Sequence, residues 1–519
     1  MYMKSNHIII GALALLCSAS LSAQTSKVHV NTADQSGNII PKEIYGQFSE
    51  HLGSCIYGGI WVGKDSEIPN IDGYRTDVLE ALKEIEVPVM RWPGGCFADD
   101  YHWMDGIGPQ EQRTKISNNN WGGTIEDNSF GTHEFLNFCE LLGCQPYISG
   151  NVGSGTAEEL AKWVEYMTSD SPSTVADLRR ANGREKAWDV KYLGIGNEAW
   201  GCGGNMRPEY YSDLFRRYTT YTRNYNRQHG LYKIASGASD TDYNWTEVCM
   251  REIGRNMDAI AVHYYTTLGW GPMEKGFATK FTDKDYYRII GRANGIDECI
   301  QKHIAIMDKY DPEKKVNLLV DEWGTWWEVE PGTNPGHLFQ QNTMRDVIVA
   351  ALSFNVFHKY TERLKMCNIA QVVNVLQSMV LTRGAEMVKT PTWYLFEMYK
   401  PYMEARYVPV EYEAGVIEKN DKGTVPELSV SAACKDGSTI VSLVNPSLSK
   451  ARKVVLDWDE YNAAASVSAR ILASGNIADY NDFGVEPAVA TKDFTDFKVT
   501  AKGVEFKLPA SSVVVFSIK

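Results

Sequence analysis

Short apolar runs recur between about residues 40 and 400, and each run ends in polar residues followed by a glycine-rich loop. Near-continuous apolar runs are typical of strands in a parallel sheet that is buried on both faces. We therefore predict eight strands in this part of the chain. They begin at Ile44, Val87, Pro146, Tyr192, Ile234, Ala259, Val316 and Ala370.

Amphipathic stretches separate these apolar runs and predict helices. The clearest stretches span residues 74–85, 132–142, 157–167, 208–227 and 337–357. Strands that alternate with helices indicate a parallel α/β fold, and eight such units favour a closed (β/α)8 TIM barrel over an open sheet. We assign this barrel domain to residues 44–401.

The pattern changes after about residue 402, where short alternating strands are separated by Gly, Asn and Asp turns. This pattern predicts an antiparallel, jelly-roll-like β-sandwich over residues 402–519. The apolar positions near residue 28 predict one more strand, within residues 24–43, that joins the sandwich. No low-complexity linker separates the two units, so we expect them to pack together.

The N-terminus has the layout of a secretory signal peptide. Lys4 precedes an apolar run from Ile8 to Leu16, and small residues lead to a cleavage site after Ala23. The run is too short to span a membrane. We therefore expect residues 1–23 to be removed and the mature chain to be exported, to the periplasm or the medium.

Charge and cysteine content narrow the class of protein. The chain has 52 basic and 65 acidic residues, a formal net charge of -13, which argues against a nucleic acid or a membrane as partner. Ten cysteines are present, but they are scattered and no pair of Cys-x-x-Cys units suggests zinc. A chain of this length needs no disulfide framework, so we expect mostly free thiols and no metal.

Two glutamates follow predicted strands on opposite walls of the barrel. Glu198 ends the fourth apolar run, and Glu322 ends the seventh. Barrel enzymes carry their catalytic groups at the C-terminal ends of strands. Glycoside hydrolysis needs two carboxyl groups, one to protonate the leaving oxygen and one to attack the anomeric carbon, roughly 5–5.5 Å apart in retaining enzymes. We therefore predict a retaining glycoside hydrolase.

Other polar residues are expected at the same end of the barrel. The side-chain amide of Asn197 can donate a hydrogen bond to a sugar hydroxyl. The positive charge of Arg91 favours the ionised form of a nearby carboxyl group. We expect His263 to orient its neighbours by hydrogen bonding, Cys96 to line the pocket and Trp121 to offer a flat face to a sugar ring. Each residue also has a structural alternative, because a single strand-end glutamate is more often part of a structural salt bridge.

Six motifs in the same order resemble the family 51 α-L-arabinofuranosidases. They cover residues 48–53, 91–97, 101–109, 196–198, 321–323 and 369–375. The resemblance extends from about residue 28 to the C-terminus. It implies a barrel with a C-terminal β-sandwich, assembly into trimers or hexamers, and no cofactor.

The resemblance also implies a role for each site residue. Glu198 matches the family's acid/base and Glu322 its nucleophile. The positions that match the arabinose-binding subsite are Glu50, Arg91, Cys96, Asn197, Tyr265 and Gln371, with His263 beside them and Trp121 near the substrate entrance. Some members carry Asn where this chain has Cys96. The implied activity is release of terminal α-L-arabinofuranose from arabinan, arabinoxylan or derived oligosaccharides.

Two alternatives remain open at this point. The first is another hydrolase of the same clan, such as a β-xylosidase or an endoglucanase. The second is a non-catalytic carbohydrate-binding protein on a degenerate barrel, although the presence of both glutamates argues against it. The sequence leaves the natural polysaccharide undetermined.

Overall fold

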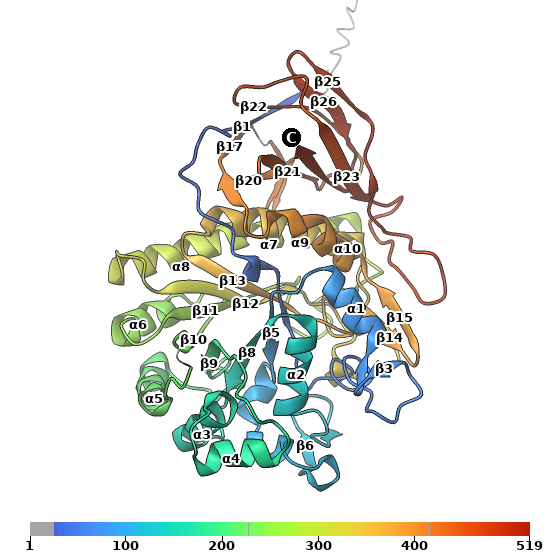
Figure 1. Cartoon of the computed structure of the whole chain (residues 1–519). Coiled ribbons are helices and arrows are strands. Elements are labelled where there is room, and N and C mark those ends of the chain that lie inside the picture. Colours follow the sequence, from blue (N-terminus) through green and yellow to red (C-terminus); the bar gives the residue numbers. More distant parts are fainter. Residues whose placement is uncertain (1–24, 227, 414) are drawn as a thin grey trace, which may run out of the picture.

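The computed structural model describes residues 25–226, 228–413 and 415–519 (Figure 1). The predicted signal peptide, residues 1–23, lies outside the described residues. No helix within the described ranges has both the length and the apolar character that a membrane span requires.

Eight parallel strands close into the predicted barrel. In chain order they are β2 (Gly46–Phe48), β5 (Val89–Trp92), β8 (Gln145–Gly150), β9 (Tyr192–Ile195), β10 (Tyr232–Ser239), β11 (Ala259–Thr266), β12 (Asn317–Thr325) and β13 (Leu364–Ala370). A buried cluster that includes Tyr192, Ile234, Ala259 and Leu319 fills the barrel near the strand starts. The interior is thus a packed core, and the carboxyl ends of the strands are left to form a site.

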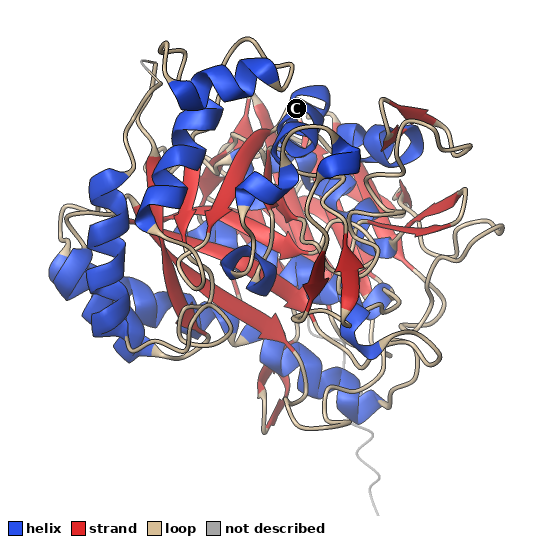
Figure 2. Cartoon of the chain, turned by 90° about the horizontal axis from the view of Figure 1, so that it is seen from below, coloured by secondary structure: helices blue, strands red, loops and turns tan. Residues whose placement is uncertain are grey.

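Helices surround the strands on the outside (Figure 2). They are α1 (Thr76–Glu84), α2 (Thr132–Leu142), α3 (Ala157–Thr168), α4 (Thr174–Ala181), α5 (Pro208–Tyr221), α6 (Tyr243–Ile253), α7 (Asp283–Asn294), α8 (Ile296–Tyr310), α9 (Met344–Phe357) and α10 (Pro391–Tyr399). Every residue of α9 is buried, because this helix packs on β12 and also on sandwich strands (Figure 1).

Two predicted helices are shorter than expected. Helix α5 ends at Tyr221, since Thr222 takes an extended conformation and its neighbours Thr219 and Thr220 bond back to carbonyls in the helix. Helix α9 starts at Met344 rather than near residue 337, because Thr343 and Asp346 form a capping box there.

Two sheets form the C-terminal sandwich. The five-stranded sheet has the order β17 (Val410–Tyr412), β1 (Ser26–Val30), β22 (Arg452–Trp458), β26 (Gly503–Leu508) and β25 (Phe497–Thr500). The six-stranded sheet has the order β16 (Arg406–Val408), β20 (Ser429–Lys435), β21 (Ser438–Asn445), β27 (Ser512–Ile518), β23 (Val467–Ala473) and β24 (Lys492–Asp493). The sandwich departs from a purely antiparallel arrangement because β1 runs parallel to β22.

Both units also contain small two-stranded hairpins. They pair β3 (Asn70–Ile71) with β4 (Tyr74–Arg75), β6 (Ile116–Asn118) with β7 (Thr124–Glu126), β14 (Val380–Arg383) with β15 (Glu386–Lys389), and β18 (Val416–Asn420) with β19 (Gly423–Pro426). The β18–β19 hairpin contacts α7, so it adds to the junction between the barrel and the sandwich.

The inward face of β1 generates a stability prediction. Val28 is fully buried in the sandwich core, whereas the neighbouring Lys27 is exposed. Val28→Asp places an unpaired charge in that core and should lower the free energy of unfolding by about 3 kcal/mol or more. Lys27→Asp should leave the urea midpoint nearly unchanged. Equal midpoints for the two variants would show that β1 contributes no core packing.

Candidate active site

Glu198 and Glu322 face each other at the carboxyl ends of their strands. Glu198 follows β9 and Glu322 lies within β12, and carboxylate oxygens of the two side chains lie within 4.8 Å of each other. This separation matches the roughly 5–5.5 Å between carboxyl groups of retaining glycosidases rather than the wider gap of inverting ones.

The turn that presents Glu198 is tightly constrained. Gly196 has a φ of +83°, and a Cβ there would meet Val152 at 2.4 Å, so glycine is required. Glu198 itself has a φ of +40°, an uncommon conformation for a residue with a side chain. The backbone therefore turns sharply enough to aim Glu198 across the mouth of the barrel.

Two donors fix the carboxylate of Glu322. Arg91 Nη1 donates to Oε1 at 2.8 Å, and the Tyr265 hydroxyl donates to Oε2 at 2.7 Å. Arg91 and Tyr265 come from β5 and β11, so Glu322 is held from two directions. This fixed orientation is what a nucleophile needs to meet a reacting carbon in line.

Arg91 also contacts other residues at the base of the site. Its guanidinium also donates to Ser149 Oγ at 3.2 Å, to the Asp321 carbonyl at 3.0 Å and to Asn197 Oδ1 at 2.5 Å. Although burial alone would lower it, the charges of Asp321 and Glu322 raise the pKa of Arg91 above its usual value. Arg91 is therefore a permanent buried cation beneath the two glutamates.

His263 connects Glu198 to Asp321. Its Nδ1 lies 2.8 Å from Glu198 Oε1, and its Nε2 lies 3.1 Å from Asp321 Oδ1. Burial opposes its charge, but Glu322, Asp321 and Glu198 together raise the pKa of His263 to about 10. Burial also opposes the charge of Asp321, yet Arg91 and His263 lower its pKa to about 2. His263 is thus a cation at neutral pH that hydrogen-bonds Glu198 through Nδ1 and forms an ion pair with Asp321 through Nε2.

Glu198 has the environment of a proton donor. Burial, followed by the nearby charge of Glu322, raises the pKa of Glu198, while the hydrogen bond from His263 opposes this shift. A carboxyl group with a raised pKa stays protonated at higher pH. The geometry therefore distinguishes the two glutamates, with Glu198 favoured in its acid form.

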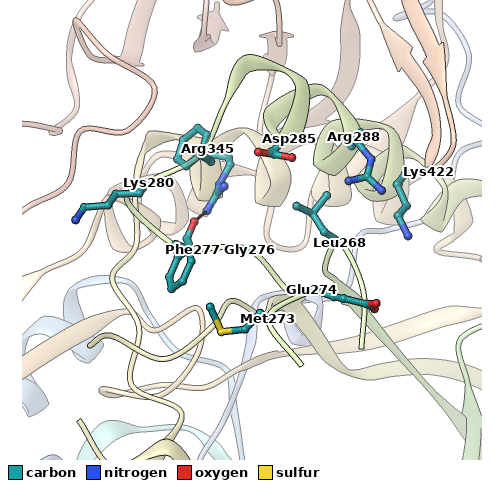
Figure 3. Close-up of a pocket in the computed structure, with 11 residues that line it drawn as sticks. Leu268, Met273, Glu274, Gly276, Phe277, Lys280, Asp285, Arg288, Arg345 and Lys422 are labelled. Carbon is teal, nitrogen blue, oxygen red and sulfur yellow. Dashed lines mark hydrogen bonds between the residues drawn. The ribbon is translucent and has the colours of Figure 1, made fainter. Parts of the chain in front are cut away.

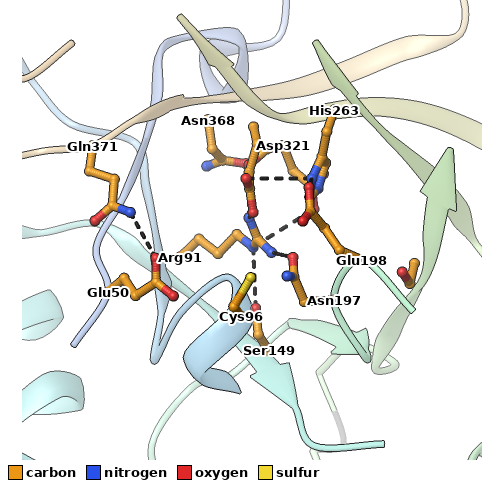
Figure 4. Close-up of polar contacts among 12 residues, drawn as sticks. Glu50, Arg91, Cys96, Ser149, Asn197, Glu198, His263, Asp321, Asn368 and Gln371 are labelled. Atoms are coloured by element: carbon orange, nitrogen blue, oxygen red, sulfur yellow. Dashed lines mark hydrogen bonds and ion pairs between the residues drawn. The ribbon is translucent and has the colours of Figure 1, made fainter. Parts of the chain in front are cut away.

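A second group of polar residues surrounds Glu50. Its carboxylate accepts from Phe97 N at 3.0 Å and from Trp121 Nε1 at 2.8 Å. It also accepts from Gln371 Nε2 at 2.9 Å (Figure 4). Burial, with a smaller contribution from the charge of Glu322, raises the pKa of Glu50 to about 7. Gln371 Oε1 and Asn197 Nδ2 have no hydrogen-bond partner among the described residues. These unpaired groups suit the hydroxyls of a small polar ligand.

The structure thus brings all the predicted site residues to one end of the barrel. Cys96 is a special case, because it forms a disulfide with Cys202 rather than a free thiol. The Cys202 sulfur lies 3.6 Å from Glu198 Oε2, so the disulfide borders the proton donor. The other cysteines in the described ranges are free. Two cysteines that are 106 residues apart gave no sign of this pairing in the sequence.

Asp99 is a site-supporting residue that sequence reasoning missed. Its carboxylate accepts from the backbone N–H groups of Val152 at 2.7 Å, Gly153 at 2.9 Å and Asn197 at 2.9 Å. It therefore ties the loops that follow β8 and β9 to the turn after β5. Its only sequence signal is an aspartate that directly follows the apolar pair Phe97 and Ala98.

Two polar residues at strand ends lie outside the site. His51 bonds Glu126 at 2.9 Å and accepts from Trp92 at 3.1 Å, within a buried aromatic cluster. Asn151 donates to the Tyr101 carbonyl at 3.1 Å and to Ser154 at 3.0 Å, which shapes its own loop. Both residues support the loops around the mouth of the barrel.

Two groups of donor atoms near Glu198 have the spacing of metal ligands. One combines Glu198 with Cys96 and Cys202, and the other combines it with His263 and Glu322. The two cysteine sulfurs are bonded to each other, and protonated His263 has no free lone pair. The chemistry of these donors therefore favours acid–base work over metal binding.

Comparisons with known proteins agree with this arrangement. A family model described as "Alpha-L-arabinofuranosidase 1 domain" matches residues 81–285, and one described as "Alpha-L-arabinofuranosidase C-terminal domain" matches residues 321–512. A relative from Bacteroides ovatus, named "Intracellular exo-alpha-L-arabinofuranosidase", is 57% identical over 99% of each chain.

The name of this relative overturns one expectation. The N-terminal pattern predicted a signal peptide and export to the periplasm or the medium, but the Bacteroides ovatus relative is named intracellular. Because that relative matches 99% of both chains, the expectation of an exported protein is wrong.

Solved structures give the same family. The chain is 48% identical to a GH51 arabinofuranosidase from Xanthomonas axonopodis pv. citri, with a TM-score of 0.92 over 95% of this chain and 100% of that one. It is 28% identical to an arabinose complex of the Thermotoga maritima α-L-arabinofuranosidase, with a TM-score of 0.81 over 95% and 99%. The chain therefore belongs to the α-L-arabinofuranosidases of glycoside hydrolase family 51.

Proposed function

We propose that this protein is a retaining, exo-acting α-L-arabinofuranosidase. The observation that carries the proposal is the pair of carboxyl groups, within 4.8 Å of each other, whose environments differ. Glu322 is held by Arg91 and Tyr265, whereas burial raises the pKa of Glu198. One carboxylate fixed for attack and one carboxyl group kept as an acid are the requirements of double displacement.

In the first step, Glu322 attacks the anomeric carbon of a terminal α-L-arabinofuranose. The bond to the leaving oxygen breaks as Glu198 donates its proton to that oxygen. In the second step, Glu198 removes a proton from water, and the water oxygen displaces Glu322 from the anomeric carbon. The sugar is released with its original configuration, and both glutamates return to their starting protonation states.

The group around Glu50 supports the binding of a single sugar. Glu50, Gln371 and Asn197 present buried acceptors and donors to hydroxyl groups, and Trp121 is fixed by its hydrogen bond to Glu50. Cys96 and the cation His263 complete the lining on the side of Glu198. A small cluster of buried polar groups suits a single terminal sugar, which is why we assign exo action.

The substrate and the assembly follow from the family. We assign arabinose-containing oligosaccharides or polysaccharides, such as arabinan or arabinoxylan, as the substrate class. We also assign a homo-oligomer, a trimer or a hexamer, which analytical ultracentrifugation tests. The competing activities of the same clan are tested by assaying aryl arabinofuranoside, aryl xyloside and cellulose side by side, with only the first expected to be cleaved.

Replacement of the nucleophile tests the mechanism directly. Glu322→Ala should reduce turnover of an aryl α-L-arabinofuranoside by about 10⁴-fold or more, because no covalent intermediate can form. Added azide should restore activity and yield the glycosyl azide of inverted configuration, which also shows that the variant is folded. Glu313→Ala, at an exposed position, is the matched control and should retain full activity. Turnover that persists in Glu322→Ala without azide would rule out this assignment.

The cation at His263 generates a prediction about pH dependence. Activity requires protonated Glu198, so it is lost as pH rises through the pKa of that group. Because the His263 cation opposes the raised pKa of Glu198, His263→Gln should raise that pKa further. The basic limb of kcat/KM should therefore move to higher pH.

The control for this shift is Tyr264→Phe, a neighbour on β11 whose hydroxyl donates to the Arg292 carbonyl outside the site. Its pH profile should match that of the wild type. A basic limb that moves to lower pH in His263→Gln would contradict the proposed electrostatics.

A further inference from the structure

The loop between β11 and α7, residues 267–282, carries an exposed tryptophan. Trp270 is 58% exposed at the tip of this loop. Tryptophan is highly buried on average in folded proteins, and an exposed apolar surface beside a site often marks ligand binding. The mechanism above gives Trp270 no role.

Trp270 connects to the nucleophile through two other aromatic rings. Tyr265, which donates to Glu322, lies 4.9 Å from Trp326 between ring centroids. Trp326 in turn lies 5.3 Å from Trp270, and all the rings in this group meet nearly at right angles. Exposure increases along this series, from buried Tyr265 through half-buried Trp326 to Trp270. The aromatic surface therefore leads outward from the reacting carbon.

The turn that carries Trp270 is closed by a contact with the exposed side chain of Glu274. Glycines flank the tryptophan on both sides, and a Cβ on Gly269 or Gly271 would meet the Glu274 side chain at 2.7 or 2.6 Å. Glu274 also accepts from the Gly271 backbone N–H at 3.0 Å. The two glycines thus leave room for the Glu274 side chain, whose hydrogen bond to Gly271 closes the turn beside Trp270.

The base of the same loop is anchored to the barrel. Arg345 Nη2, from α9, donates to the carbonyls of Phe277 and Ala278 at 3.0 Å, and its guanidinium stacks on Phe281 and Trp327. Glu328 N also donates to the Gly276 carbonyl at 2.8 Å. Figure 3 shows Arg345 directed at Phe277 beside a cavity of about 580 Å³ behind the loop. A loop held in this way presents a pre-organised surface.

The position of this loop places Trp270 on the leaving-group side of the site. Glu198 must face the leaving oxygen, and its partner His263 belongs to β11, the strand that leads into the loop. Glu50 and its partner Gln371, assigned to arabinose binding, directly follow β2 and β13. Strand β11 is separated from β2 by β12 and β13 in the barrel. Trp270 therefore lies on the side of the barrel away from Glu50 and Gln371.

We propose that Trp270 is a platform for a pyranose unit in the leaving group. The ring C–H bonds of a chair-form pyranose make a flat apolar face that matches an exposed indole, whereas a furanose ring is smaller and puckered. This inference rests on the proposed arabinofuranosidase activity. It predicts that the enzyme prefers arabinofuranose attached to a pyranose backbone over arabinofuranose attached to another furanose.

Three substrates with different leaving groups test the platform. They are methyl α-L-arabinofuranoside, which has no ring in its leaving group, an arabinofuranosyl xylobiose and an arabinofuranosyl arabinobiose. Trp270→Ala should lower kcat/KM about 10-fold on the xylobiose derivative, mainly through KM, because an aromatic contact is lost. The methyl glycoside should be unaffected, the arabinobiose derivative should change less than 3-fold, and Trp270→Phe should retain part of the effect.

Met273→Ala is the matched control, since Met273 is 66% exposed on the same loop, and all three rates should stay at the wild-type level. Three results with Trp270→Ala would each overturn the platform. They are an equal loss of kcat/KM on all three substrates, no loss on any substrate, and an equal loss on the xylobiose and arabinobiose derivatives. Failure of the wild-type enzyme to cleave any arabinofuranoside would instead overturn the proposed function.

Discussion

The buried cation of Arg91 is the interaction on which the site depends. Its guanidinium contacts the Glu322 carboxylate, the Asp321 carbonyl and Asn197, and it lies over the Phe48 ring with a distance of 4.5 Å to the centroid. Carboxyl groups so close together in a water-poor site repel one another unless a fixed positive charge compensates them. Without Arg91, the nucleophile would be an unpaired buried charge at the centre of the barrel. A side chain that reaches three strands at once also fixes their separation, so the same residue supplies both charge and geometry.

The second cation, His263, helps to give Glu198 and Glu322 different roles. Asp321 is ionised beneath it, with a pKa near 2, and this keeps His263 charged and unavailable as a base. Proton transfer is then left to Glu198, whose pKa is raised by burial first and by Glu322 second. When Glu322 becomes covalently bound in the proposed mechanism, it loses its charge and that contribution disappears. The pKa of Glu198 then falls, which favours its carboxylate form, the form that acts as general base in the second step.

Periodicity was enough to predict a barrel, because a strand buried on both faces leaves an apolar run and a helix leaves an amphipathic one. The eighth run was misplaced, because it was predicted from Ala370, where β13 ends. Once the strands were counted, the rule that barrel sites form at carboxyl ends placed Glu198 and Glu322 together. Contacts between segments that are far apart in the sequence leave no periodic pattern from which they could be predicted. The Cys96–Cys202 bond, the Asp99 contacts and the parallel pairing of β1 with β22 depend on how loops and strands meet in space. The N-terminal leader pattern was misleading, since it depends on composition over few residues.

The supporting contacts that the sequence did not reveal have a common consequence. Glu198 has a backbone conformation with a φ of +40°, which an isolated turn would relax. The Asp99 carboxylate holds the Asn197 N–H next to it, and the disulfide holds Cys202 four residues later. On the other wall, Glu274 and Arg345 hold the loop that carries Trp270. The proton donor and the aromatic surface beyond it are therefore both fixed before substrate binds. Little ordering entropy then remains to oppose binding, and interactions with the leaving group can act on the bond that breaks.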